Sequence, residues 1–124
     1  MAKKKKVADE SEILTDAIVN GMLELKAKDI VVLDMRTVGS SITDFFVICT
    51  GESNTQVDAI ANSIRKEVQK IVGEPPHHEE GFSNSEWILL DYVNVVAHIF
   101  QPDQRKYYNL EKLWADAEMK QIAA

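Results

Sequence analysis

The sequence has few of the features that form disulfides, anchor a chain in a membrane or bind polyanions. Cys49 is the one cysteine in 124 residues, so an internal disulfide is excluded and a reducing compartment is favoured. No apolar run approaches the roughly 20 residues needed to span a bilayer, and the N-terminus lacks the apolar segment of a signal peptide. We therefore expect a cytoplasmic protein.

Positive charge is also scarce. The chain has 14 Lys and Arg against 20 Asp and Glu, for a net charge of −6. This balance argues against broad nucleic-acid binding by the folded body, because phosphate contacts are made by Lys and Arg. It favours a basic partner, since opposite charge speeds association.

One basic run, Lys3-Lys4-Lys5-Lys6, departs from the acidic balance. A charge run of this kind is usually solvated and disordered, with a loose contact to RNA as the alternative. We therefore predict a disordered Lys-rich N-terminus over residues 1–10, one folded domain over 11–117, and a frayed C-terminal tail over 118–124.

Two long helices are expected in the first part of the chain. Apolar residues at helical spacing predict the first over residues 11–26, capped by Ser11. The second begins at a capping box formed by Ser53 and Gln56 and ends at Gly73. Between the helices, apolar and β-branched residues predict strands over 30–35 and 45–50.

The stretch 86–100 reads as two strands joined by a tight turn at Val93-Asn94. Its first arm is apolar on both faces, which is typical of a central strand covered on both sides. Before it, 76–80 follows Pro75-Pro76 and suits a short edge strand. After it, Pro102 starts two short helices with Asn109 as a cap between them. The elements predict an α/β (α+β) domain with a mixed sheet of about five strands flanked by helices.

No catalytic constellation accompanies this fold. Gly39-Ser40 near an acidic strand hints at a nucleotidyltransferase, but the residue two positions after Asp44 is Phe46, so a carboxylate pair on one strand face is missing. Cys49 lies inside an apolar strand, where a thiol is usually inert. His98 lies mid-strand and is expected to be a hydrogen-bonded structural residue. We predict no enzyme activity and no cofactor.

Aromatic residues beside acids offer a better candidate. Trp87 and Tyr92 bracket the turn region, and Asp91, Val93 and Asn94 lie beside them. Aromatic anchors ringed by polar residues are typical of binding hot spots. These five residues are the predicted partner-binding site.

Five blocks, in order, resemble the Iojap-like ribosomal silencing factor family (RsfS) over roughly residues 11–116. They are Asp29-Ile30-Val31-Val32-Leu33-Asp34, Ser40-Ser41-Ile42-Thr43-Asp44-Phe45-Phe46-Val47-Ile48-Cys49-Thr50-Gly51, Glu86-Trp87-Ile88-Leu89-Leu90-Asp91-Tyr92, His98-Ile99-Phe100 and Tyr107-Tyr108-Asn109-Leu110-Glu111-Lys112-Leu113-Trp114.

The resemblance implies a nucleotidyltransferase-like core without catalytic carboxylates. It also implies binding to ribosomal protein number fourteen of the large subunit, which blocks joining of the small subunit and represses translation when nutrients are short. The family commonly has Gly-Asp where this chain has Val93-Asn94. Three alternatives remain: a divergent nucleotidyltransferase, a large-subunit assembly factor, and a module that forms a homodimer away from the ribosome.

Overall fold

Six strands form one mixed sheet in the computed structural model, which describes residues 2–39 and 41–123, with side chains from Glu10 onward. The strands are β1 (Lys28–Asp34), β2 (Phe45–Thr50), β3 (His78–Glu80), β4 (Trp87–Asp91), β5 (Val95–Phe100) and β6 (Glu118–Gln121). Their order across the sheet is β3-β4-β5-β2-β1-β6. The β2–β5 pair is parallel and the others are antiparallel, so the predicted mixed sheet is confirmed.

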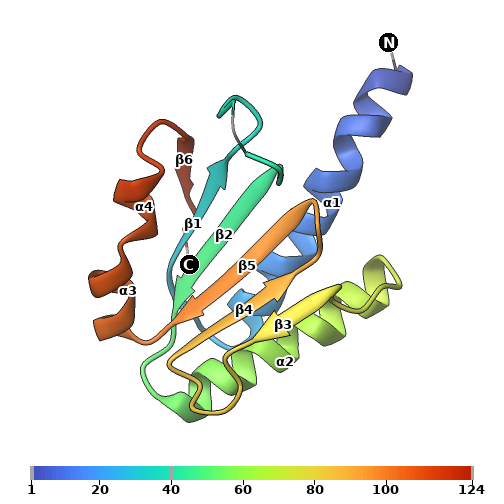
Figure 1. The fold of residues 1–124 in the computed structure, drawn as a ribbon. Coiled ribbons are helices and arrows are strands. Elements are labelled where there is room, and N and C mark those ends of the chain that lie inside the picture. The colour runs from blue at the N-terminus through green and yellow to red at the C-terminus, as the bar shows by residue number, and fades with distance from the viewer. Residues whose placement is uncertain (1, 40, 124) are drawn as a thin grey trace.

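Two long helices, α1 (Ala2–Glu24) and α2 (Asn54–Ile71), cover one face of the sheet (Figure 1). They cross closely at Gly21, where an added Cβ would lie 2.7 Å from the Cα of Ile64. Together with the facing strand residues they enclose the main core. None of the helices in the described ranges is both long and apolar enough to cross a membrane.

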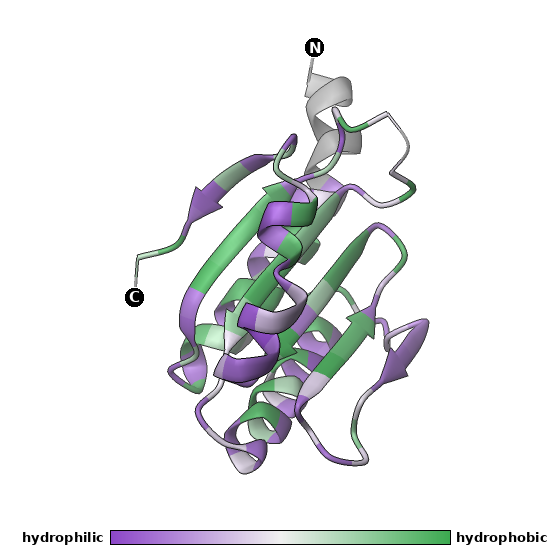
Figure 2. Ribbon diagram, turned by 60° about the vertical axis from the view of Figure 1, so that its left-hand side comes forward, coloured by the Kyte–Doolittle hydropathy of each residue, from purple (hydrophilic) through white to green (hydrophobic). Residues whose placement is uncertain are grey.

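The second face carries a smaller core beneath two short helices, α3 (Pro102–Tyr108) and α4 (Leu110–Leu113). Pro102 lies in the first turn of α3, and Asn109 ends that helix in the left-handed conformation, as predicted. These helices lie over the part of the sheet nearest β1, and they leave much of β4 and β5 uncovered (Figures 1 and 2). The expectation that helices cover β4 on both sides is therefore wrong.

The capping box of α2 is confirmed with one change. Ser53 Oγ accepts a hydrogen bond from the backbone N–H of Gln56 at 3.1 Å. The Gln56 side-chain oxygen in turn accepts a hydrogen bond from the N–H of Glu52 at 2.8 Å, rather than from that of Ser53. At the other end, Gly73 adopts a positive φ of 82° just past the helix, a conformation that glycine adopts without steric cost.

The ends of the chain differ from expectation. α1 begins at Ala2, so Ser11 lies inside the helix and is buried rather than capping it. The Lys3–Lys6 side chains lie outside the described residues, and the predicted division at residue 10 stays a prediction. The tail after Ala117 does not fray throughout, because Glu118–Gln121 pairs with the free edge of β1 as β6.

Candidate partner-binding surface

The uncovered part of the second sheet face is a shallow hollow of about 540 Å³. Half-buried side chains of Phe46, Leu89 and Trp114 line it, together with buried Val96 and His98. Two segments form its rim at one end of the sheet: the β1–β2 loop with Ile42, and the β4–β5 turn. We call this surface the open face; its lining residues are Ser41, Ile42, Thr43, Phe46, His77, Leu89, Asp91, Val93, Val96, His98 and Trp114.

Strand alternation decides which side chains reach the open face. Successive residues of a strand point to opposite sides, so Trp87, Leu89 and Asp91 of β4 share the open side. Ile88 and Leu90 are fully buried in the main core on the other side. Figure 2 shows the apolar strands β4 and β5 beside α3 and α4, with hydrophilic β3 at the edge.

Trp87 lies beside the hollow rather than in it. Its ring packs on Phe100 at a centroid distance of 4.8 Å and on Tyr108 at 4.6 Å. Its indole N–H donates a hydrogen bond to Nδ1 of His98 at 3.1 Å. Trp87 therefore links α3 to the sheet, and this contact confirms the hydrogen bond expected for His98.

Tyr92 does not share a surface with Trp87. Its side chain is 5% exposed and packs in the main core on the opposite side of the sheet. Burial raises the pKa of Tyr92 to about 12. The expectation that Trp87 and Tyr92 bracket one exposed patch is wrong, because they are five positions apart, and residues an odd number of positions apart along extended chain point to opposite faces.

Asp91, Val93 and Asn94 shape the turn at the rim. The Asp91 carboxylate accepts a hydrogen bond from the N–H of Val93 at 2.7 Å. The N–H of Asn94 donates to the carbonyl of Tyr92 at 2.9 Å across Val93, which has a φ of 75°. The carbonyl of Asn94 in turn accepts from the N–H of Asp44 at 2.8 Å, and this ties the turn to the start of β2.

His98 lies in the wall of the hollow and is 4% exposed. Burial lowers the pKa of His98 to about 4, so the ring is neutral near pH 7. The ring of Phe46 meets it edge-on at 4.9 Å. Because both residues are held by the sheet, the floor of the hollow is preformed.

The charged side chains of β3 and β4 on the open side are mostly acidic. His78 pairs with Asp91 and Glu80 pairs with Leu89 across the strands, so these side chains lie on the same side as the hollow. Glu80 binds Nε2 of His78 at 2.7 Å and raises the pKa of that histidine. An apolar floor with an acidic border suits a partner that is itself basic.

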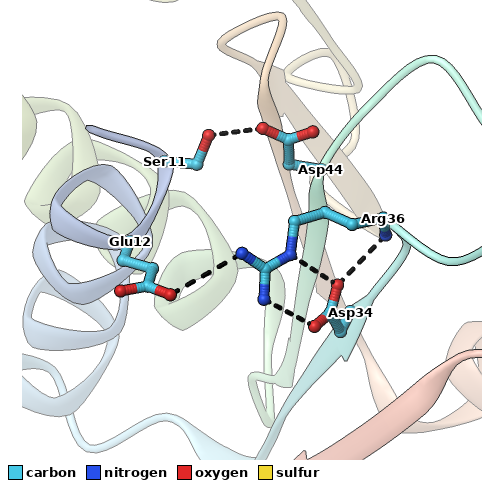
Figure 3. A network of polar contacts seen from close by, with 5 residues as sticks. All are labelled: Ser11, Glu12, Asp34, Arg36 and Asp44. Carbon is cyan, nitrogen blue, oxygen red and sulfur yellow. Dashed lines mark hydrogen bonds and ion pairs between the residues drawn. The ribbon is translucent and has the colours of Figure 1, made fainter. Parts of the chain in front are cut away.

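The acids near β1 and β2 are engaged in structural contacts (Figure 3). Asp44 accepts a hydrogen bond from the hydroxyl of Ser11 at 2.5 Å, which joins α1 to the start of β2. Asp34 forms two side-chain contacts with Arg36, at 2.9 and 2.8 Å, and the hydrogen bond from this guanidinium lowers the pKa of Asp34. Within the described residues, no three His, Cys, Asp or Glu side chains gather as a metal site requires.

Sequence reasoning missed three contributors to this surface. Leu89 is marked by the period-two alternation that places it with Trp87 and Asp91. Ile42 is 97% exposed, and the signal that could have identified it is that it is an apolar residue within a polar loop. Trp114, at the end of α4, lies half-buried, 6.1 Å from Phe46 between ring centroids.

Fold and surface together define a small mixed α/β domain with a preformed apolar face. The chain belongs to the ribosomal silencing factor family: residues 8–124 match the family model described as "Ribosomal silencing factor during starvation". This description names a regulator and no reaction, in agreement with the expectation of a protein that is not an enzyme.

The chain is similar to bacterial proteins and to a mouse protein. The chain is 44% identical to ribosomal silencing factor RsfS of Halalkalibacterium halodurans over 104 residues, covering 84% of this chain and 87% of that protein. It is 43% identical to the RsfS of Bacillus subtilis over 97 residues, or 78% and 80% of the two chains. It is also 31% identical over 115 residues to the mouse protein named "Mitochondrial assembly of ribosomal large subunit protein 1", covering 88% of this chain and 50% of the mouse protein.

Solved structures share the fold. A crystal structure from Chromobacterium violaceum matches with a TM-score of 0.78 at 31% identity, covering 90% of this chain and 91% of that chain. One from Bacillus halodurans matches with a TM-score of 0.73 at 40% identity, covering 90% and 97%.

Proposed function

We propose that this protein places its open face on the large ribosomal subunit, where it contacts ribosomal protein number fourteen. The bound domain then occupies space that the small subunit needs, and translation falls under nutrient limitation. The observation that carries the proposal is the preformed apolar hollow with its acidic border, in a chain of the ribosomal silencing factor family. The proposed site of action is the cytoplasm.

The apolar contact is proposed to come from Leu89, Ile42 and Val93, with Asp91 meeting a Lys or Arg of the partner. Leu89 is half-buried in the free protein and Val93 is 53% exposed, so both have surface left to bury. Trp87 contributes by holding His98 and the α3 contact in place. Tyr92 supports the sheet from its other side, and Asn94 holds the rim through its backbone.

Co-sedimentation with purified large and small subunits tests the proposal. Wild-type protein should pellet with the large subunit alone. Leu89→Ala should weaken binding about tenfold, as expected for a central apolar anchor. Ile42→Ser should weaken it without loss of stability, because Ile42 is 97% exposed.

Ile71→Ser is the matched control, since Ile71 is an exposed isoleucine at the end of α2, on the other layer of the fold. A gradient assay of subunit joining then tests the mechanism, because only variants that bind should keep the subunits apart. Equal binding by wild type, Leu89→Ala and Ile42→Ser would remove the open face from the proposal.

A second candidate function is a role in assembly of the large subunit. The name of the mouse relative favours it, because that protein is called an assembly protein of the ribosomal large subunit. Both functions would use the same binding event. Subunit profiles of growing cells separate them: loss of an assembly factor leaves immature large-subunit particles, whereas loss of a silencing factor leaves a normal profile until starvation.

Two further contacts belong to the proposal. The open face is where a second copy would pack into a homodimer away from the ribosome, which a concentration series in analytical ultracentrifugation tests. Weak contact of Lys3, Lys4, Lys5 and Lys6 with ribosomal RNA predicts that removing residues 2–6 lowers the salt dependence of ribosome binding, because each phosphate contact adds to that dependence.

A further inference from the structure

Two buried polar atoms in the wall of the hollow lack a hydrogen-bond partner. Among the described residues, four buried side-chain atoms have none, and two of these, Oγ1 of Thr43 and Nε2 of His98, belong to residues that line the open face. The other two belong to Thr15 on α1 and to Tyr92 in the main core. Buried polar groups are nearly always paired, so two unpaired atoms around one hollow call for an explanation.

The hydrogen bond from Trp87 determines which nitrogen of His98 carries the proton. An indole N–H can only donate, so Nδ1 of His98 must accept at the observed 3.1 Å. The neutral ring therefore carries its proton on Nε2. This N–H is a donor with no acceptor among the described residues.

The hydroxyl of Thr43 has no partner among the described residues, although the backbone groups of Thr43 are bonded. The carbonyl of Thr43 accepts from the hydroxyl of Ser41 at 2.9 Å, and its N–H donates back to that oxygen at 3.3 Å. Oγ1 remains, and a hydroxyl can both donate and accept. The wall of the hollow thus holds one fixed donor and one adaptable group behind an apolar lining, and both are shielded in the free protein.

We propose that the occupant of the open face is an extended peptide segment of the basic ribosomal partner, bound through its main chain. A backbone carbonyl of the segment accepts the Nε2–H of His98, and a neighbouring peptide group pairs with the hydroxyl of Thr43. The side chains of the segment pack on Leu89 and Val96. This inference rests on the proposed function and specifies what the partner offers at the site.

A purely apolar plug fits the hollow less well. It would leave both polar atoms buried without partners, at a cost that a peptide group removes. The acidic border disfavours a nucleic-acid backbone for the same reason that it favours a basic protein. Since Nε2 of His98 and Oγ1 of Thr43 are shielded in the free protein, docking must shift a half-buried side chain beside the preformed floor, either Leu89 or Trp114.

Thr43→Val is the sharpest test, because it replaces the hydroxyl by a methyl group of nearly the same size. Thr15→Val is the matched control: it removes another unpaired buried hydroxyl, from α1 on the opposite layer. Binding to purified large subunits and to purified ribosomal protein number fourteen is measured for both. Thr43→Val should bind about tenfold more weakly in both assays, and Thr15→Val should bind as wild type.

His98→Phe is a second variant for the same binding assays, and circular dichroism checks that it folds. It should also bind about tenfold more weakly. If Leu89→Ala weakens binding while Thr43→Val and a folded His98→Phe do not, the inference is wrong and the proposed function stands. If Thr43→Val binds the subunit weakly but the isolated ribosomal protein normally, the occupant is another component. If wild type binds neither, the inference and the proposed function both fall.

Discussion

Replacing Val93 with glycine should stabilise this protein, because Val93 is held in a backbone conformation that suits glycine. Its φ is 75°, and the hydrogen bond across it from Asn94 to Tyr92 makes the turn a γ-turn. This turn is strained, and a β-branched residue at positive φ is a genuine outlier.

The size of the effect follows from two opposing terms. A side chain at positive φ costs about 1–2 kcal/mol, and this cost is removed by glycine. Against it, glycine gives the unfolded chain more freedom, which costs about 0.5–1 kcal/mol. Val93 is 53% exposed, so little packing is lost. The free energy of unfolding should rise by about 1 kcal/mol, and Tm by about 4 °C for a chain of this length.

Thermal and urea unfolding of three variants at Val93 measures how much the backbone strain at this residue lowers the free energy of unfolding. Val93→Ala keeps a Cβ and should gain less than half as much as Val93→Gly. Val93→Asn should fall between them, because asparagine tolerates positive φ better than valine does. If Val93→Gly is no more stable than wild type, or if Val93→Ala matches it, the reasoning from backbone strain is refuted.

Two further predictions concern buried groups. Because His98 has a folded pKa of about 4 and an unfolded pKa of about 6.5, the unfolded state binds the extra proton. The free energy of unfolding should therefore fall by up to roughly 3 kcal/mol as the pH drops from about 6.5 to about 4. Urea unfolding midpoints measured across this range should depend less on pH in His98→Phe than in the wild type. An equal dependence in both proteins would contradict the lowered pKa of His98. Tyr92→Phe should leave ribosome binding unchanged and raise the free energy of unfolding by about 1 kcal/mol, since it removes a buried hydroxyl without a partner. Weakened binding would show that Tyr92 belongs to the partner-binding surface.

The elements that the sequence predicts well are those with strong local signals. β2 runs from Phe45 to Thr50 as expected, and α2 lies between its capping box and Gly73. Pro102 and Asn109 mark the ends of α3. In each case the residue acts through its own backbone or through neighbours along the chain, so no knowledge of distant contacts is needed.

Prediction fails where pairing across the sheet decides the outcome. The segment Glu118–Gln121 is short, exposed and charged, with weak preference for a strand, and it forms β6 because β1 offers a free edge. Ser11 is a plausible cap in local terms, yet Asp44 accepts its hydroxyl hydrogen bond from a position 33 residues away. Such partners are set by topology, which a local pattern does not contain.

The predicted partner-binding residues lie on both sides of the sheet for a related reason. Val93 and Asp91 line the hollow and Trp87 supports it, but Tyr92 was grouped with them by closeness in sequence. Alternation alone would have separated Tyr92 from Trp87 and added Leu89. The unpaired atoms of Thr43 and His98 could not be foreseen, because only the structure reveals which neighbours a buried atom lacks.

Three features around the open face lower the free energy of unfolding. Strained Val93, the unpaired hydroxyl of Thr43 and the unpaired N–H of His98 all lie around one hollow. If these features serve binding, the substitution that removes one should separate stability from function. Thr43→Val should then raise the free energy of unfolding by about 1 kcal/mol, since an unpaired buried hydroxyl is lost, while binding to the large subunit weakens. Thr15→Val should raise stability by a similar amount with unchanged binding. If both variants gain stability and both bind as wild type, the unpaired atoms of the open face are packing defects with no part in recognition.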